Sequence, residues 1–374
     1  MKECKSRILA GLILALSTPL VWAEYELNLR QGVTDISHQV YDLHMMIFWI
    51  CVIIGAGVFG VMFYAMFKHR KSKGHEAAQF HESTTVELVW TTVPFLILIG
   101  MAIPAAKTLI AMEDNSAADM TVKVTGYQWK WQYEYMDGDA KGVNFFSNMS
   151  TPRDQIENRA EKGENYLLEV DNPLVLPVGK KVRFLITAND VIHSWWVPDF
   201  AVKKDAIPGF INEIWTKIDE PGVYRGKCAE LCGKDHGFMP VEVVALEEHK
   251  YLDWVAEQKA AGQVAAAEAD KEWSKDDLIA KGEGVYNKNC ASCHQPTGAG
   301  LPGVFPAITG SPIATGKIED HINMVMNGKV GTAMQAFGAQ LGDVDLAAVI
   351  TYQRNALGNS VGDVATPQQI KTKR

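Results

Sequence analysis

Two cysteines, a histidine and a methionine lie close together in the segment 228–239 and could bind a metal ion. Cys228 and Cys232 offer thiolates, His236 an imidazole and Met239 a thioether. Thiolate and imidazole ligands favour copper or zinc over magnesium or calcium. A structural zinc site uses Cys and His ligands and has no need of a thioether, so the methionine favours copper. The alternative, in which both cysteines are small packing residues, does not fit the glycines and charged residues around them.

A second motif, Cys290-Ala291-Ser292-Cys293-His294, has the spacing that attaches a c-type haem. Its two cysteines form thioether bonds to the haem, and the adjacent histidine is an axial ligand of the iron. A bare Cys-x-x-Cys would also be compatible with a dithiol redox motif. The histidine, and the lack of a thioredoxin-like pattern of strands and helices, favour haem over that alternative.

A methionine downstream is expected to be the second axial ligand of the haem iron. Met324 and Met326 fall in a predicted helix at 318–327, and their spacing of two cannot put both on one helix face, so we interpret them as packing residues. Met334 lies in a glycine-containing loop before a predicted helix at 343–357. This arrangement resembles small class I cytochromes c, whose distal methionine comes from such a loop, and the resemblance favours Met334.

Three apolar segments in the first third of the chain predict export and membrane insertion. Residues 1–23 combine basic residues, an apolar run and a small-residue end at Ala23, which is the pattern of a cleaved signal peptide. An uncleaved anchor is the alternative. Segments 45–67 and 88–110 are each long enough to cross a bilayer as a helix. The loop between them is rich in Lys and Arg, which places it in the cytoplasm and everything after it outside.

Between residues 121 and 247 the pattern changes to short runs rich in β-branched residues, separated by Gly, Pro and Asn. This pattern predicts an all-β sandwich or barrel. The expected strands include 121–127, 166–170, 182–188, 214–218 and 241–246. His193 follows one of these strands, and the fold could bring it beside the cysteine loop. A lone histidine is usually a structural residue, but the incomplete metal site favours His193 as a ligand.

The cysteine loop, taken together with His193, resembles the binuclear copper A site of subunit II of haem-copper cytochrome c oxidases. The resemblance covers residues 25–252 and includes the two-helix hairpin, the aromatic segment 126–131 and the segment 205–209. It implies that the extramembrane part is a cupredoxin-like Greek-key barrel. The ligands it implies are Cys228 and Cys232 bridging two copper ions, His193 and His236 binding one copper each, Met239 binding weakly at one copper, and the backbone carbonyl of Glu230 binding at the other.

The resemblance also assigns roles to three further groups. Trp129 matches the tryptophan through which electrons enter the copper site, although an aromatic residue there could instead pack in a core or interface. The Glu230 carboxylate matches a ligand of magnesium at the boundary with subunit I. Glu87 matches the mouth of a proton pathway into subunit I, although the helix dipole alone would favour an acid there. Phe210 and Tyr127 depart from the Arg and His of many relatives, at positions that bear on contacts with subunit I or the electron donor.

Composition changes again after the copper domain, so the chain is expected to carry a fused haem domain, as in caa3-type oxidases. The expected parts are a transmembrane hairpin at 24–112, a copper domain at 113–253, an Ala-, Gln- and Glu-rich linker at 254–272 that is helical or semi-flexible, an all-α class I cytochrome c domain at 273–358 and a tail at 359–374.

The resemblance implies an electron-transfer subunit of a proton-translocating oxidase that reduces oxygen, and this subunit is not catalytic alone. Electrons would pass from a donor, such as a cytochrome c or another respiratory complex, through haem c and copper A to the haem of subunit I. Subunit I and subunit III are the expected partners. The chain would lie in the bacterial inner membrane, with its copper and haem domains on the periplasmic side.

Two other functions are compatible with parts of the pattern. A membrane-anchored copper chaperone also uses paired cysteines and a distant histidine, and a nitrous oxide reductase-like protein also has a copper A site. The formal net charge of −8, from 36 basic and 44 acidic residues, argues against nucleic acid as a partner.

Overall fold

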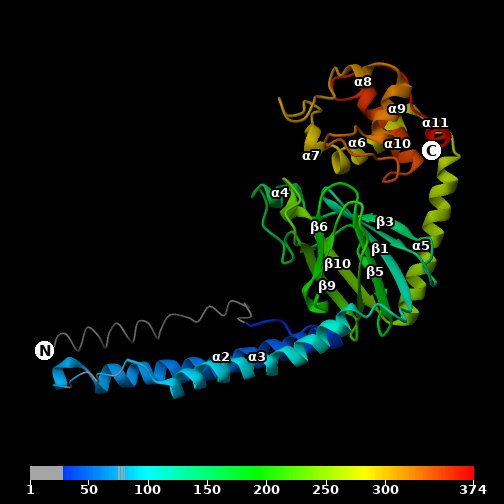
Figure 1. The fold of residues 1–374 in the computed structure, drawn as a ribbon. Coiled ribbons are helices and arrows are strands. Elements are labelled where there is room, and N and C mark those ends of the chain that lie inside the picture. The colour runs from blue at the N-terminus through cyan, green and yellow to red at the C-terminus, as the bar shows by residue number, and fades with distance from the viewer. Residues whose placement is uncertain (1–27, 75, 77–78, 80) are drawn as a thin grey trace, which may run out of the picture. The chain divides into compact units, whose positions relative to one another are not determined.

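The computed structural model describes residues 28–374 apart from 75, 77–78 and 80, so the predicted signal peptide lies outside the described residues. The chain divides into two compact units, coloured from blue to green and from yellow to red in Figure 1 for most of their length. The first contains the described residues up to Gly138 together with Ser147–Glu247, and the second contains Asp139–Phe146 and Glu248–Arg374. The short strand β3 (Asn144–Ser147) straddles this division.

Two long apolar helices begin the first unit. They are α2 (Asp35–Lys68) and α3 (Thr84–Glu113), and the short helix η1 (Lys71–Lys73) lies in the basic loop between them. Both helices are long and apolar enough to span a membrane, with mean hydropathies of 2.5 and 2.0 over their most apolar windows. They contain the predicted spans 45–67 and 88–110 and extend beyond them. Pro94 and Pro104 lie within α3. Prolines are tolerated in membrane-spanning helices because neighbouring helices can satisfy the backbone groups that they leave unbonded.

The strands of the first unit form two sheets. One contains, in order, β2 (Lys130–Tyr135), β1 (Met120–Tyr127), β5 (Lys181–Ala188) and β8 (Asn212–Lys217). The other is β4 (Leu174–Pro177), β10 (Pro240–Leu246), β9 (Gly222–Cys228), β6 (His193–Val197) and β7 (Val202–Ala206). Three short helices lie among the strands, α4 (Arg153–Ile156), η2 (Pro198–Phe200) and η3 (His236–Phe238). The result is the predicted all-β, cupredoxin-like domain.

The core of this β domain lies between the two sheets. Alternate residues of β5 are buried, as expected of a strand with one face towards a core. Phe184 of β5 and Trp195 of β6 come from opposite sheets, and their ring centroids are 4.8 Å apart. Burial of such large rings contributes much of the free energy that holds two sheets together.

Four of the five strands named from sequence are confirmed, and one prediction is wrong. The segment 166–170 forms a turn instead of a strand, with the Tyr166 amide bonded to the Gly163 carbonyl. Leu167 has a φ of 62°, which no extended strand allows. Val170, at the end of this segment, forms an isolated β-bridge with Met149.

The end of α3 is fastened to the β domain by hydrogen bonds to backbone carbonyls. Trp215 of β8 donates from Nε1 to the Ala111 carbonyl at 3.0 Å. Lys181 of β5 donates from Nζ to the carbonyls of Asp114 and Ser116, at 2.7 Å each, and its ammonium lies 4.4 Å from the centre of the Trp215 ring. Cationic donors at a helix C-terminus satisfy carbonyls that have no partner within the helix. The apolar hairpin and the β domain are therefore joined by side chains as well as by the chain itself.

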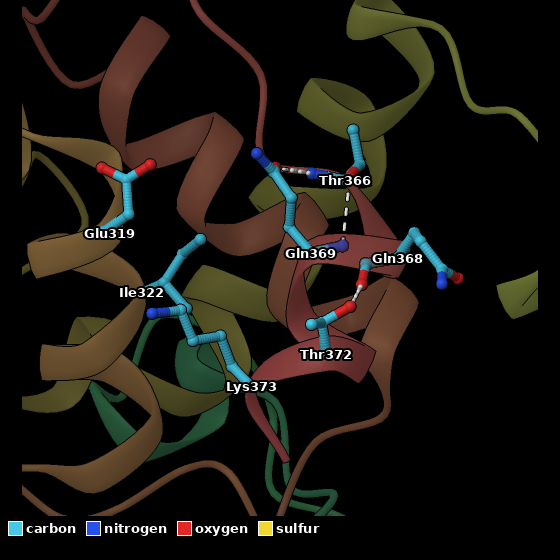
Figure 2. A pocket seen from close by; sticks show the side chains of 7 residues that line it. All are labelled: Glu319, Ile322, Thr366, Gln368, Gln369, Thr372 and Lys373. Carbon is cyan, nitrogen blue, oxygen red and sulfur yellow. Dashed lines mark hydrogen bonds between the residues drawn. The ribbon is translucent and has the colours of Figure 1, made fainter.

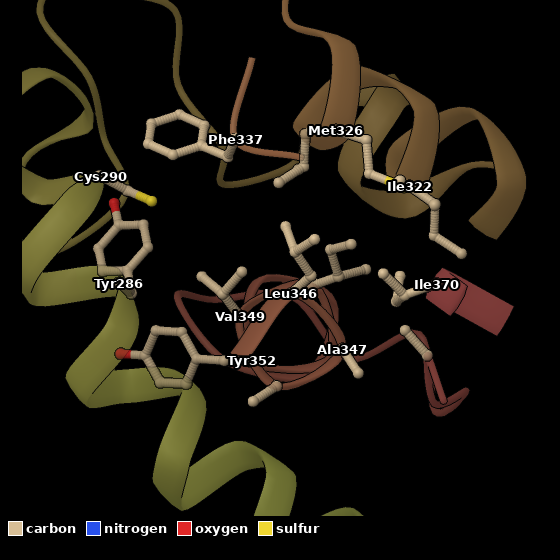
Figure 3. Close-up of a cluster of buried hydrophobic side chains, with 14 of the residues drawn as sticks. Tyr286, Cys290, Ile322, Met326, Phe337, Leu346, Ala347, Val349, Tyr352 and Ile370 are labelled. Carbon is tan, nitrogen blue, oxygen red and sulfur yellow. The ribbon is translucent and has the colours of Figure 1, made fainter. Parts of the chain in front are cut away.

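The second unit is helical. Its elements are α5 (Glu248–Ala269), α6 (Lys275–Asn289), α7 (Ala291–His294), α8 (Pro312–Thr315), α9 (Ile318–Asn327), α10 (Asp343–Asn355) and α11 (Pro367–Lys373). Helices α6 and α10 cross in close contact at Gly282, where an added Cβ would lie 2.1 Å from the Ala348 carbonyl oxygen. Figure 3 shows the core beside this crossing, with Tyr286 and Cys290 facing Val349 and Tyr352 of α10.

Two segments outside the predicted cytochrome domain have regular structure. Helix α5 runs through most of the predicted linker, so that segment is helical. The predicted tail contains α11, whose Ile370 is fully buried in the same core as Leu346 and Ile322. Residues 359–374 are thus packed into the helical unit instead of trailing from it.

An ion pair between a buried arginine and a partly exposed aspartate joins α10 to the segment before α11. Arg354 is 1% exposed, and its Nε and Nη2 lie 2.7 Å from the two carboxylate oxygens of Asp363. Arg354 also donates to the carbonyls of Ala314 and Gly316. The hydrogen bonds from Arg354 lower the pKa of the Asp363 carboxyl.

Replacing Asp363 with Asn is expected to lower the free energy of unfolding of the helical unit by about 2 kcal/mol, because it leaves the buried guanidinium without its counter-charge, while solvent partly screens the 41% exposed carboxylate. The folded-state pKa of Asp363 lies below its unfolded value of about 4, so this contribution is complete above that pH and lost as the pH falls through the lower value. Thermal unfolding of the full chain as a function of pH measures both effects. Asp270→Asn, which breaks the exposed pair with Lys371, is the matched control and should change stability by less than about 1 kcal/mol.

Candidate metal centre and haem-attachment site

The soft ligands of the first motif lie on a loop that the β-sheet closes at both ends. Cys228 ends β9, Met239 precedes β10, and the Cys228 amide donates to the Met239 carbonyl at 2.9 Å. Between them the chain turns at Gly233, whose φ of 115° suits glycine and few other residues. The antiparallel pairing of β9 with β10 thus holds the first and last residues of the motif side by side.

Two thiols and two imidazoles converge at this loop. The sulfurs of Cys228 and Cys232 are 3.8 Å apart. The Nδ1 atom of His193 lies 4.0 Å from the Cys228 sulfur, and that of His236 lies 3.5 Å from the Cys232 sulfur. Each cysteine therefore has one histidine beside it. The structure brings His193, which is 35 residues from Cys228, to the position that the sequence predicted.

The two remaining predicted ligands lie at the same loop. The Glu230 carbonyl oxygen is 3.3 Å from the Cys228 sulfur, whereas the residue as a whole is exposed to solvent, so its backbone faces the cluster and its carboxylate is accessible. Met239 is 1% exposed. The cluster of two sulfurs, two imidazole nitrogens and a carbonyl, with the buried Met239 at the end of the same loop, fits the ligand preference of copper.

The two neighbouring thiols affect each other's acidity. The hydrogen bond with the Cys232 thiol, with further help from His193, lowers the pKa of Cys228. The pKa of Cys232 is raised, because it shares that hydrogen bond, is buried and would become a second negative charge beside the first. Metal binding replaces such protons, since thiolates and not thiols are ligands. The pair is thus suited to a cation that both sulfurs share.

His193 is held in the orientation of a ligand by Asp190. The imidazole is fully buried, and its Nε2 lies 2.8 Å from Asp190 Oδ1. Burial opposes its protonation, but the hydrogen bonds to Asp190 and Cys228 outweigh that effect and raise its pKa. A carboxylate on Nε2 leaves Nδ1 free to face the cysteine. Gly126 leaves room for this ring, since an added Cβ there would lie 2.8 Å from His193 Cδ2.

The role of Asp190 was not predicted from the sequence. Its position three residues before the candidate ligand His193 could have indicated a carboxylate that orients the imidazole. Replacing Asp190 with Asn is expected to weaken copper binding about 10- to 100-fold. The negative charge beside His193 Nε2 is lost, and one amide oxygen cannot serve both His193 and the Gln128 backbone amide, which the two carboxylate oxygens now bond separately. Competition of the purified chain with a copper chelator measures this affinity. Asp219→Asn, at an exposed position of the same domain, should leave the affinity unchanged.

The predicted Trp129 lies against the cysteine loop. Its Nε1 donates to the Cys232 carbonyl at 3.2 Å, and Gln128 Nε2 donates to the same oxygen at 2.9 Å. The backbone amide of Gln128 donates to Asp190 Oδ2 at 2.7 Å. Trp129 is partly exposed, and its indole nitrogen contacts the backbone of a cysteine of the predicted metal site. Gln128 was not predicted from the sequence.

The haem-attachment motif lies where α6 ends and α7 begins. Cys290 is buried and caps α6, and Cys293 and His294 lie in α7. His294 Nδ1 lies 2.8 Å from the Pro306 carbonyl oxygen. A backbone acceptor on Nδ1 fixes the proton there and leaves Nε2 free to bind iron. The three residues therefore fit covalent attachment of haem with His294 as an axial ligand.

Met334 lies in a closed loop between α9 and α10 and packs partly buried against the helical core. Gly328 begins the loop with a φ of 66°, and the Lys329 amide donates to the Met334 carbonyl at 3.0 Å. Of the alternatives, Met326 is buried and Met324 half-buried, both within α9. A methionine that packs within a helix would have to leave its packing contacts to bind the haem iron. Met334, in the loop, stays the predicted ligand.

Glu87 lies in the first turn of α3 and is exposed. Its backbone carbonyl accepts a hydrogen bond from the Thr91 hydroxyl at 2.9 Å. This position satisfies both the helix-dipole interpretation and the proton-pathway interpretation.

A pocket elsewhere in the helical unit contains none of these residues. It has a volume of about 260 Å³ and lies between α9 and α11 (Figure 2). Its lining is Glu319, Ile322, Thr366, Gln368, Gln369, Thr372 and Lys373. These side chains include no thiol or imidazole, so the pocket is separate in chemistry from both motifs.

The fold and its two motifs define a membrane-anchored protein with a cupredoxin-like domain and a cytochrome c-type domain. Three family models match the chain: the transmembrane domain of cytochrome c oxidase subunit II over residues 22–108, the periplasmic domain of that subunit over 120–246, and subunit III of cbb3-type cytochrome c oxidase over 262–352. The chain belongs to the cytochrome c oxidase subunit 2 family and carries a fused cytochrome c domain.

Curated relatives agree with this assignment. The probable cytochrome c oxidase subunit 2 of Rickettsia prowazekii is 36% identical over 240 residues, which is 64% of this chain and 74% of that protein. Cytochrome c oxidase subunit 2 of Mycosarcoma maydis is 37% identical over 238 residues, or 63% of this chain and 91% of that protein. Among solved structures, the periplasmic domain of subunit II (CoxB) of Bradyrhizobium japonicum is 43% identical, covers 38% of this chain and 96% of its own, and has a TM-score of 0.34.

Proposed function

We propose that this chain is the subunit that receives electrons for a haem-copper oxidase and passes them, one at a time, through haem c and binuclear copper A to the haem of subunit I. The observation that carries the proposal is the arrangement of two sulfurs 3.8 Å apart with one histidine Nδ1 beside each. A site for a single copper ion would not need two adjacent cysteines that each have a histidine beside them. When bound there, copper supplies a one-electron couple, and the thiolate ligands share its charge between two metals.

The proposed ligands are six groups at or beside the loop. His193 and His236 would each hold one copper, Cys228 and Cys232 would be shared by both, and Met239 and the Glu230 carbonyl would complete the set. The residues around them limit movement: Asp190 holds His193, and the Cys232 carbonyl accepts two hydrogen bonds. A scaffold that keeps its ligands in place in both oxidation states lowers the cost of rearrangement on electron transfer.

Electrons are proposed to enter the copper site through Trp129. The support is its direct hydrogen bond to the Cys232 carbonyl, combined with partial exposure of the ring. From the indole nitrogen, one hydrogen bond and the covalent bonds of Cys232 lead to a bridging sulfur. The fused haem domain is the immediate donor in this proposal, with Cys290 and Cys293 holding the haem and His294 and Met334 binding its iron.

The remaining proposed roles concern partners. The exposed Glu230 carboxylate is proposed to bind magnesium at the boundary with subunit I, and Glu87 to lie at the mouth of a proton pathway into that subunit. Oxygen reduction and proton pumping then belong to the assembled oxidase and not to this chain alone. The inner membrane of a bacterium is the proposed location, with both electron-carrying domains on its periplasmic side.

Electron paramagnetic resonance of the isolated, copper-loaded full-length chain tests the relay. A mixed-valence signal from two equivalent coppers, with two metal ions per chain, is the expected result. A single mononuclear copper that a chelator removes readily would contradict the relay and favour a copper chaperone. A reduced-minus-oxidised spectrum of the same sample tests for the covalent haem independently.

A further inference from the structure

A buried histidine and a buried glutamine lie beside the haem-attachment motif. His321 of α9 is 3% exposed, and Gln353 of α10 is 4% exposed. The core around them consists mainly of aliphatic and aromatic side chains, among them Ile322, Val349 and Ile350. Burying polar groups in such surroundings costs free energy unless they bond to each other or to a further partner. A hydrogen bond between the two side chains satisfies the oxygen of Gln353 but leaves its amide nitrogen in need of an acceptor.

That acceptor is the first cysteine of the haem motif. His321 Nε2 lies 2.8 Å from Gln353 Oε1, and Gln353 Nε2 lies 3.9 Å from the Cys290 sulfur. The three residues come from α9, α10 and the end of α6. Figure 3 shows the sulfur of Cys290 on the side of the core that faces α10. The contacts thus run from one helix, through a second, to the atom that attaches the haem.

The directions of these hydrogen bonds follow from the chemistry of the groups. Burial lowers the pKa of His321 to about 4, so its imidazole is neutral at physiological pH. Its Nδ1 is buried and has no hydrogen-bond partner among the described residues, whereas Nε2 faces an oxygen that can only accept. The proton therefore resides on Nε2. This hydrogen bond occupies the Gln353 oxygen and turns the Gln353 amide nitrogen towards Cys290.

A sulfur in a thioether has lone pairs and no proton, so it can only accept a hydrogen bond. The amide group of Gln353 is the matching donor. Its N–H dipole has its positive end towards the sulfur, and inside a protein such a dipole acts more strongly than in water. Hydrogen bonding in the surroundings of a haem is one of the means by which a protein sets its reduction potential.

We propose that Gln353 donates a hydrogen bond to the Cys290 sulfur and thereby raises the reduction potential of the attached haem, and that His321 is the positioning residue that holds Gln353 in this orientation. The inference rests on the proposed attachment of haem at Cys290. In the proposed relay, this hydrogen bond would help to set the reduction potential of haem c, the first carrier.

Redox titration of the haem absorbance in the full-length chain tests the proposal. Gln353→Leu, which has similar volume and no donor, is expected to lower the ratio of reduced to oxidised haem at a fixed potential about two- to tenfold, the effect of one net hydrogen bond. His321→Leu should shift the ratio in the same direction, because Gln353 is then free to turn away. His321→Gln, whose amide can donate to Gln353, should restore the original ratio.

Thr351→Val is the matched control, since Thr351 is fully buried on the same helix and bonds to Ala365 instead of Cys290. Its reduced-to-oxidised ratio should equal that of the unaltered chain. An unchanged ratio in Gln353→Leu, or an equal change in Thr351→Val, overturns the proposal. If Gln353→Leu does not fold, Gln353→Met decides by the same criterion. Absence of covalent haem from the unaltered chain would instead refute the proposed function, so the two failures are distinguishable.

Discussion

Replacing Cys228 with Ser is expected to abolish the binuclear copper centre. The Cys228 sulfur lies within 4.0 Å of the Cys232 sulfur, His193 Nδ1 and the Glu230 carbonyl, so it joins more of the proposed ligands than any other described atom of the loop. A hydroxyl is a harder and far less acidic ligand than a thiol and cannot bridge two soft metal ions. The copper content of the purified chain and its electron paramagnetic resonance spectrum measure the loss.

Cys51→Ser is the control for this experiment. Cys51 lies in α2, far from the loop in sequence and exposed on the apolar helix, and its replacement should retain the full copper content. Retention of a mixed-valence signal in Cys228→Ser would contradict the assignment of the bridging ligands. The haem absorbance should be unchanged in both variants, because its attachment involves other cysteines.

Replacing Met334 with Ala is expected to convert the haem iron from low spin to high spin. Loss of an axial thioether leaves the iron with His294 as its one strong axial ligand from the protein. The loop itself should persist, because Gly328 and the Lys329 amide close it through backbone groups. The visible absorption spectrum of the oxidised chain measures the spin state.

Met324→Ala serves as the comparison, because this residue is half-buried in α9 and is a predicted packing residue. Its spectrum should keep the low-spin form. A low-spin spectrum in Met334→Ala together with a high-spin spectrum in Met324→Ala would reassign the ligand to the helix.

The positions of regular elements followed well from local sequence where one physical signal dominated. The apolar spans and the alternating strands are set by burial of one surface, which hydrophobic residues record directly. The strand expected at 166–170 failed because its apolar residues occur in a turn, where Leu167 has a positive φ and its amide donates to the Thr151 hydroxyl, 16 residues away in the sequence. The helix α11 had a readable start in Thr366-Pro367, an N-cap followed by proline, which the prediction of a tail passed over.

The ligand residues were predictable and their supporting residues were not. Soft side chains at short spacing identify a metal motif by their type alone. Asp190, Gln128, His321 and Gln353 act through contacts that only the folded chain creates, and each belongs to a common residue type with many ordinary positions. The pairing of His321 with Gln353 joins residues 32 apart in the sequence, and no local pattern records such a contact.

The bonds that fasten α3 to the β domain decide where a soluble fragment of this protein can begin. A fragment cut at Thr121, the start of the predicted β pattern, would remove the carbonyls of Ala111, Asp114 and Ser116. Trp215 of the edge strand β8 and Lys181 of the neighbouring β5 would then lose these acceptors. A fragment that keeps the last turn of α3 retains these bonds, so its copper site can be studied without the membrane and without this added perturbation.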